Sequence, residues 1–354
     1  MESLPRAAPS VMAAPRDGRL DVLRGVAIIL VLFWHLNPLG DIRGLTASNW
    51  DFGHEVTLLA VPVLFLVSLY LFAKRADRGL AYLVRRLRRI AWLLLAWGTV
   101  QIAVYAVIRG SLPAWSWSLI YMGGPPLPIV FGSVFYFLFN LLLLTALMGA
   151  YARLPRRPRI VVGWFVVAAS AALFEAVTSN RVSRIPYYSP LNFIVYVPLA
   201  YWLASLRPSA RPSASRFWPA LALVYLALAF QDVTVHNVSV YGRPSLVVGA
   251  LVMSMAALAA RPRPAPRAEL VGRYSLGIFA IHKYAWYVVA RSVALSGLSL
   301  PRRAGELLPC LVALCAVFLT GIAVWLVAAS PARALVTEGR RPERVAIPRQ
   351  VTMR

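Results

Sequence analysis

The first apolar segment of the chain carries two side chains that could move a proton. Arg24 and His35 lie eleven residues apart within the run RLDVLRGVAIILVLFWHLN. Eleven residues are close to three helical turns, about 16 Å of rise, so both side chains fall on one helix face, which Asp21 shares. Ionisable groups are costly within a membrane, so we interpret this stripe as a candidate functional site. His35 is the candidate general base, because histidine accepts protons near neutral pH.

Each member of this stripe also has a structural interpretation. His35 could be a polar residue at a helix end, and Arg24 could extend its head group to the membrane surface. Asp21 could interact with the helix dipole, form an ion pair with Arg24, or do both. The sequence leaves these alternatives open.

A second candidate site is a cluster of arginines just before the third apolar segment. A guanidinium binds a phosphate through two parallel hydrogen bonds, so the cluster could hold a phosphorylated ligand. A basic loop beside a membrane is the alternative interpretation. The cluster consists of Arg85, Arg86, Arg88 and Arg89.

Two further apolar segments contain ionisable residues. His54 and Glu55 begin the second segment, where either a solvated helix start or an acceptor site is compatible with the sequence. His282 and Lys283 interrupt a late segment, where they either pair within a helix bundle or belong to an active site. Asp232, at the end of another segment, is expected to be solvated.

The composition predicts an integral membrane protein built from helices. Of the 354 residues, 60% are hydrophobic and only 14% are charged, whereas soluble domains average about 45–50% and 25%. Long apolar runs predict an all-α, polytopic bundle of about ten transmembrane helices. We place them at 20–37, 54–73, 90–109, 129–150, 160–177, 189–206, 217–232, 244–260, 274–295 and 306–329.

The positive charge of the chain predicts its orientation. The net charge is +24, and most basic residues fall in alternate loops and in the two ends of the chain. Basic residues mark the cytoplasmic side, so both termini are expected in the cytoplasm and no nucleic-acid partner is needed. We divide the chain into a flexible cytoplasmic tail (1–19), a transmembrane domain (20–330) and a second cytoplasmic tail (331–354). No cleavable signal is expected.

Several other kinds of chemistry are not predicted. The two cysteines lie five residues apart in the last segment and form no metal or disulfide framework. The four histidines lie in different segments, so no metal site is expected. A serine nucleophile of the G-x-S-x-G type is also absent from the sequence.

Three motifs resemble those of the acyltransferase family 3 membrane proteins. The run LDVLRGVA, followed by His35, resembles the first-helix signature of that family, an arginine, ten residues and a histidine. The run VLFLVS, ending in Ser68, resembles a turn that is followed by an R-x-x-R pair, although Leu69 replaces the usual glycine. The run YSLGIFAIH, from Tyr274 to His282, resembles a late S-x-x-I-Y-x-x-H pattern.

The resemblance implies a membrane-bound O-acyltransferase. Its members move an acyl group, often acetyl, from acyl-CoA to a hydroxyl of a glycan, a surface polymer or a small molecule. On this basis His35, Arg24 and Asp21 are the expected catalytic residues, and the arginine cluster is expected to bind acyl-CoA. The expected pocket residues are Ser68, Ser275, His282, Lys283, His54 and Glu55.

The resemblance also implies the setting of the reaction. Acyl-CoA would be a donor substrate and not a permanently bound cofactor, and the location would be a bacterial cytoplasmic (inner) membrane. No fused soluble domain of the kind that some relatives carry is expected, so a separate periplasmic transferase could be a partner. A multispan transporter or flippase for a lipid-linked or small-molecule substrate is the alternative function. A lipid-linked glycan polymerase fits less well, because the chain has only 13 acidic residues.

Overall fold

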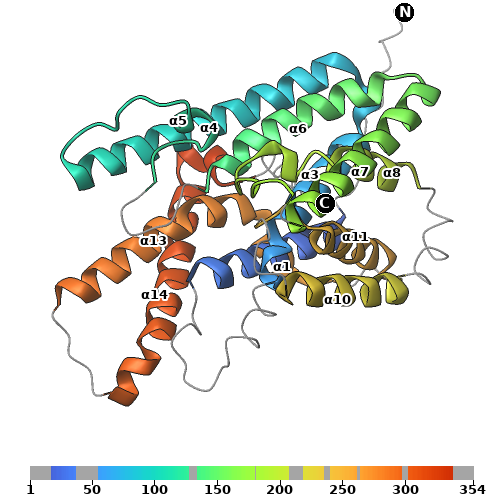
Figure 1. Ribbon diagram of the computed structural model, residues 1–354. Helices are drawn as coiled ribbons and strands as arrows, with labels where there is room; N and C mark the ends of the chain where they lie inside the picture. The colour runs from blue at the N-terminus through green and yellow to red at the C-terminus, as the bar shows by residue number, and fades with distance from the viewer. Residues whose placement is uncertain are drawn as a thin grey trace, which may run out of the picture.

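The protein is built from helices wherever the structure describes it. The computed structural model describes residues 17–36, 55–126, 134–179, 181–206, 218–234, 240–260, 264–296 and 302–337, and no strand occurs among them. The α-helices are α1 (Gly18–Leu36), α3 (Ala60–Ala73), α4 (Gly79–Arg109), α5 (Ser118–Tyr121), α6 (Tyr136–Arg153), α7 (Arg156–Thr178), α8 (Tyr196–Ser205), α10 (Trp218–Thr234), α11 (Pro244–Ala259), α12 (Pro266–Arg273), α13 (Ser275–Leu295) and α14 (Arg302–Ala329). Figure 1 shows their arrangement.

The prediction of an all-α membrane protein is confirmed. Each of the ten predicted segments contains an α-helix. Within the described residues, five helical spans are long and apolar enough to cross a membrane. They are Glu55–Ala73, Ala76–Arg109, Tyr136–Arg153, Arg156–Thr178 and Leu308–Ala329. The full count of ten spans and the cytoplasmic placement of the termini stay predictions.

Helix α3 forms the centre of the bundle, and α1, α6, α8 and α11 pack around it (Figure 1). Nearly all of its side chains are buried, which fits a sequence that is apolar on every face. Phe65 lies at its middle, with its ring centroid 4.6 Å from those of both Phe137 and Phe193. This aromatic packing joins α3 to α6 and to the turn before α8.

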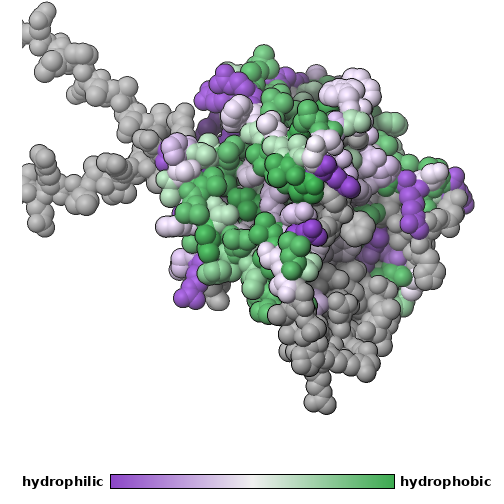
Figure 2. Space-filling model, turned by 90° about the vertical axis from the view of Figure 1, so that its left-hand side faces the viewer, coloured by the Kyte–Doolittle hydropathy of each residue, from purple (hydrophilic) through white to green (hydrophobic). Residues whose placement is uncertain are grey.

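The outer helices expose large apolar side chains. Trp164 and Phe165 on α7 and Phe318 and Trp325 on α14 are all exposed. Figure 2 shows hydrophobic residues over much of the face that it presents. A soluble monomer rarely shows such extended apolar surface, whereas lipid tails solvate it well. The exposed surface therefore agrees with a helix bundle surrounded by lipid.

Helix α12 crosses the first turns of α1 at backbone contact distance. A Cβ atom added to Gly25 would lie 2.6 Å from the carbonyl oxygen of Ala268. A Cβ atom added to Gly272 would overlap the carbonyl oxygen of Asp21. Both glycines are therefore needed because two backbones pass closely, and the glycine of the LDVLRG run has a packing role beside the candidate residues.

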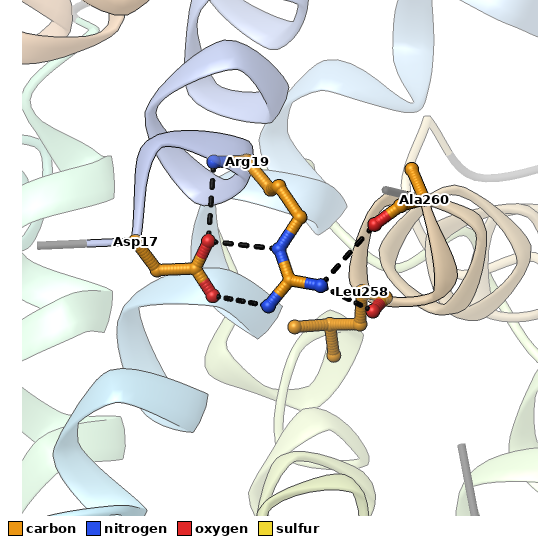
Figure 3. A network of polar contacts seen from close by, with 4 residues as sticks. All are labelled: Asp17, Arg19, Leu258 and Ala260. Atoms are coloured by element: carbon orange, nitrogen blue, oxygen red, sulfur yellow. Dashed lines mark hydrogen bonds and ion pairs between the residues drawn. The ribbon is translucent and has the colours of Figure 1, made fainter. Parts of the chain in front are cut away.

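Arg19 joins the start of α1 to the end of α11. Its Nη1 donates to the carbonyl oxygens of Leu258 at 2.8 Å and Ala260 at 3.2 Å (Figure 3). Asp17 accepts hydrogen bonds from Nε at 2.9 Å and from Nη2 at 2.8 Å. The last carbonyls of a helix have no partner within the helix, so Arg19 satisfies groups that would otherwise be left open.

Helix α4 begins earlier than the sequence predicted. The expected helix was 90–109 with the arginine cluster in the loop before it, but α4 starts at Gly79 and includes the cluster. Residues 80–90 contain no glycine or proline, and arginine and leucine are good helix formers. Helix propensity therefore extends α4 toward the N-terminus beyond its apolar part. The arginine cluster consequently lies on a helix, and each of its side chains leaves the helix in a fixed direction.

The segment after α14 packs back onto the bundle. Residues Pro331–Leu335 form a 3-10 helix, and Val336 is buried against Gly277 of α13. Trp97 of α4 donates from Nε1 to the carbonyl oxygen of Leu335 at 3.3 Å. The first residues of the predicted tail 331–354 thus contact α4 and α13, while 338–354 lie outside the described residues. The predicted domain boundaries stay predictions.

Candidate functional site

Two histidines from distant parts of the chain lie beside one another. His35 is in the last turn of α1, and His282 is in the first half of α13. Their ring centroids are 5.1 Å apart, and the ring planes are tilted by 31°. His282 is fully buried, with 0% exposure, whereas His35 is half-buried. The structure therefore joins the first and the late motif into one site.

The crossing of α1 and α12 precedes both rings in the chain. His35 lies ten residues after Gly25 (35 − 25), and His282 lies ten residues after Gly272 (282 − 272). Gly25 meets Ala268 and Gly272 meets Asp21, so α1 and α12 pair their residues in opposite order. Tyr274 separates α12 from α13. Helix α13 then packs directly against α1, and this contact brings the two imidazoles together.

The ring of His282 is held by its own helix. Its Nδ1 lies 2.8 Å from the carbonyl oxygen of Phe279 and 3.1 Å from that of Ile278. Carbonyl oxygens only accept hydrogen bonds, so Nδ1 carries the proton and donates it. In the neutral ring, Nε2 then has a free lone pair, and this atom is buried without a hydrogen-bond partner among the described residues.

Arg24 and Asp21 are both buried at the other end of α1. Arg24 is 5% exposed and Asp21 is 2% exposed, and the closest charged atoms, Nη1 and Oδ1, are 3.9 Å apart. Arg24 therefore does not extend to the surface, and the ion-pair interpretation of Asp21 agrees with the geometry. About 16 Å of helix rise separates Arg24 from His35, so both residues can contact one ligand only if that ligand is long.

Lys283 follows His282 on α13 and is also buried. Lys283 lies close enough to both His35 and His282 to interact with them electrostatically. Lys283 makes further interactions within the bundle. The pairing interpretation and the active-site interpretation of this lysine both remain compatible with its position.

The arginine cluster is divided by the geometry of α4. Arg85, Arg88 and Arg89 are exposed and, together with Trp92, line an open groove of about 410 Å³. They fall within about 100° of the helix circumference, because these positions repeat at helical spacing. Nη2 of Arg89 donates to the carbonyl oxygen of Thr337 at 2.6 Å. Three guanidinium groups and an indole ring thus share one accessible face.

Arg86 points the other way, toward α3. Its Nη2 donates to the carbonyl oxygen of Ser68 at 3.0 Å, and its guanidinium lies 5.5 Å from the ring centroid of Phe72. Arg86 therefore fastens α4 to α3, and we separate it from the three arginines of the groove. Ser68 is buried in α3, and Ser275, the first residue of α13, is buried seven residues before His282.

Glu55 forms a buried ion pair with Arg243, which precedes α11. Of the two interpretations of Glu55, the solvated helix start is therefore wrong. The expectation of a solvated Asp232 is also wrong, because it is buried and accepts a hydrogen bond from Ser245. Burial lowers the pKa of Arg243 to about 10, so it is still charged at neutral pH. His54 lies outside the described residues.

Sequence reasoning missed three contacts that shape the site. The Arg19 contacts with α11, the Glu55–Arg243 pair and the His35–His282 ring contact each join residues far apart in the chain. The signal for the last contact in the sequence was the pair of motifs that place His35 and His282 among the expected site residues. In the described part of the chain, no group of three or more His, Cys, Asp or Glu side chains gathers in a way that could hold a metal ion.

The helix bundle and its exposed apolar surface define a class, the multi-pass membrane proteins. The family model described as an acyltransferase domain matches residues 17–329, which cover all helices from α1 to α14. The chain therefore belongs to acyltransferase family 3. Searches for similar proteins among curated sequences and among solved structures found no match.

Membership of the family supports an acyltransferase activity and a multi-pass membrane protein. The matched range includes the three motifs, with Arg24, His35, the α4 arginines and His282. The family match does not name the donor, the acceptor or the role of any residue. Those assignments depend on the geometry of the site.

Proposed function

We propose that the protein transfers an acyl group, acetyl in the first instance, from acyl-CoA to a hydroxyl group of a glycan or another acceptor at the membrane. The observation that carries the proposal is the position of His35, which is half-buried inside the bundle against a second imidazole. A general base needs such a place, where it is reachable by substrate and partly shielded from water.

The reaction requires one base, which carries the proton of the acceptor hydroxyl to the departing thiolate. His35 takes the proton of the acceptor hydroxyl, and the hydroxyl oxygen attacks the carbonyl carbon of the thioester. The new C–O bond forms as the C–S bond breaks. The proton on His35 then passes to the departing thiolate, which leaves as CoA-SH. No permanently bound cofactor is needed for this sequence.

The groove on α4 suits the nucleotide end of the donor. Coenzyme A carries phosphates that guanidinium groups bind strongly, and Arg85, Arg88 and Arg89 face solvent together. Trp92 offers an aromatic face beside them. We assign this groove to the cytoplasmic side, where acyl-CoA is made, which agrees with the predicted orientation.

Arg24 and His35 then bracket the remainder of the donor. The pantetheine arm is long and slender, so it could run along the Arg24 face of α1 and present the thioester near His35. The acceptor hydroxyl would approach from the membrane interior or from the outer side of a bacterial cytoplasmic membrane. A separate periplasmic transferase could take the acyl group onward where the acceptor lies outside.

The test compares two variants in the last turn of α1. Purified protein in detergent or liposomes receives labelled acetyl-CoA and a candidate hydroxyl acceptor, and CoA release and acceptor labelling are measured. We expect His35→Ala to reduce acyl transfer by at least about 100-fold, the usual contribution of a general base. Phe33→Ala, which removes an exposed side chain two residues away, should retain activity.

The alternative function predicts a different result. A transporter or flippase would move its substrate across the liposome membrane without releasing CoA. In that case neither the wild-type protein nor His35→Ala would release CoA from acetyl-CoA. A fully active His35→Ala protein would falsify the assignment of the base. If Phe33→Ala is as inactive as His35→Ala, the activity depends on the structure of the end of α1 and not on the imidazole of His35.

A further inference from the structure

The His282 ring is prepared to accept a hydrogen bond. Its Nδ1–H is tied to the carbonyl oxygens of Ile278 and Phe279, which fixes both the tautomer and the orientation of the ring. The lone pair on Nε2 is buried, and no described residue donates to it. An unsatisfied buried acceptor is costly, so such an atom calls for an explanation.

His35 is the group placed to use this lone pair. Two imidazoles joined by an N–H···N bond of ordinary length, roughly 3 Å, have ring centroids about 5 Å apart. The His35 and His282 centroids are already 5.1 Å apart. The hydrogen bond itself is not formed in the structure, and a turn of the His35 side chain would complete it. Catalytic hydrogen bonds commonly tighten only when substrate is bound.

We propose that His282 is a positioning residue for His35: its Nε2 accepts the N–H of His35 and thereby leaves the other His35 nitrogen unprotonated toward the acceptor hydroxyl. This inference rests on the proposed function, in which His35 is the base. In the reaction His35 gains the hydroxyl proton and becomes a cation, and the His282 lone pair stabilises that cation until the proton passes to the thiolate. His282 itself gains and loses nothing.

This arrangement follows the general logic of an activated base. A base is effective when a second group holds its ring in the required tautomer and stabilises the charge that forms on it. Such a group is often a carboxylate. No described carboxylate contacts His35, whereas a neutral imidazole of fixed tautomer does. In a lipid-embedded bundle, a neutral partner avoids burying a negative charge.

The experiment uses the full-length protein and three substitutions at one position. His282→Gln keeps an acceptor oxygen at the reach of Nε2. His282→Asn keeps a donor for the Ile278 and Phe279 carbonyls but is too short to reach His35. His282→Ala keeps neither. Val288→Ala, an exposed change on the same helix, is the control.

We expect His282→Ala and His282→Asn to lose about 10²-fold or more of kcat with little change in KM for acetyl-CoA, because the base is misoriented and donor binding is not altered. His282→Gln should recover at least tenfold over His282→Asn. Thermal melting in detergent checks that each variant is folded. If His282→Ala does not fold, the ratio of the kcat values of His282→Gln and His282→Asn still tests the positioning role.

Each other outcome has a distinct meaning. Full activity of the Ala variant, or equal activity of the Gln and Asn variants, overturns the positioning role while an inactive His35→Ala protein leaves the proposed function intact. A raised KM with unchanged kcat overturns it too, because His282 would then shape a binding site. An active His35→Ala protein with an inactive His282→Ala protein would make His282 the base and overturn both assignments.

Discussion

The two arginine sites of this protein show what burial does to the same side chain. Arg24 on α1 is 5% exposed and lies beside Asp21, in a helix against which α12 packs. Arg85, Arg88 and Arg89 on α4 are exposed in an open groove. The buried guanidinium has one geometry, fixed by packing, whereas the exposed groups can adapt to a ligand. We therefore assign orientation of the site to Arg24 and recruitment of the donor to the α4 groove.

The largest effect should come from the crossing of α1 and α12. In Gly272→Ala the new methyl group would overlap the carbonyl oxygen of Asp21, and backbone atoms cannot move aside as a flexible side chain can. We expect a loss of stability beyond the roughly 1–3 kcal/mol of ordinary overpacking, up to failure to fold, together with loss of acyl transfer as His282 moves from His35. Thermal melting in detergent and CoA release measure the two effects.

Gly321→Ala on α14 is the matched control. A Cβ atom at Gly321 has nothing within 4 Å, so this change should be tolerated and could stabilise the helix by up to about 1 kcal/mol. Equal melting temperatures for the two alanine variants would contradict the close crossing. Retained activity in a destabilised Gly272→Ala protein would show that the contact between the histidines does not depend on the crossing.

The next effect concerns the charge of Arg24. Arg24→Gln leaves Asp21 as a buried carboxylate with its nearby cation removed, which costs about 3–5 kcal/mol for buried pairs. The double variant Asp21→Asn/Arg24→Gln removes both charges and should recover most of the stability. Activity should stay low in both variants if Arg24 orients the donor. Recovery of activity in the double variant would assign Arg24 to folding alone.

The sequence predicted the helices well because length and hydropathy are local properties. The run 54–73 is apolar on every face, and α3 is indeed the buried centre. The start of α4 was misplaced because apolarity ends near residue 90 while helix propensity continues to Gly79. Hydropathy reports where a helix meets lipid, and it does not report where the helix begins.

The pairings within the site could not be predicted in the same way. The partners of Arg19 are backbone carbonyls of residues 239 and 241 positions away, and any exposed helix end could have served. The sequence left Glu55 either solvated or in an acceptor site, because nothing near it in the chain shows that Arg243 will pair with it and make its burial tolerable. Such contacts depend on how helices are placed, which one sequence does not encode locally.

The smallest effect on the folded protein, and the most selective one, should come from the α4 groove. Arg85→Gln/Arg88→Gln/Arg89→Gln removes three exposed charges, so the melting temperature should change little. We expect the KM for acetyl-CoA to rise about tenfold or more at low salt, with kcat nearly unchanged, because phosphate contacts act on binding and not on the reaction. The difference from wild type should shrink in high salt, which screens exposed charges.

A control with equal charge loss decides whether position matters. Arg156, Arg157 and Arg267 are also exposed, but they lie on α7 and α12. Replacing these three by glutamine removes the same net charge from the protein, so an equal rise in KM would mean that overall charge attracts the donor. A rise confined to the α4 variant would place the donor phosphates in the groove. An unchanged KM in both variants would show that the α4 groove does not recruit the donor. The buried Arg24 would then be the next arginine to test for phosphate binding, and the roles assigned to the two arginine sites would be reversed.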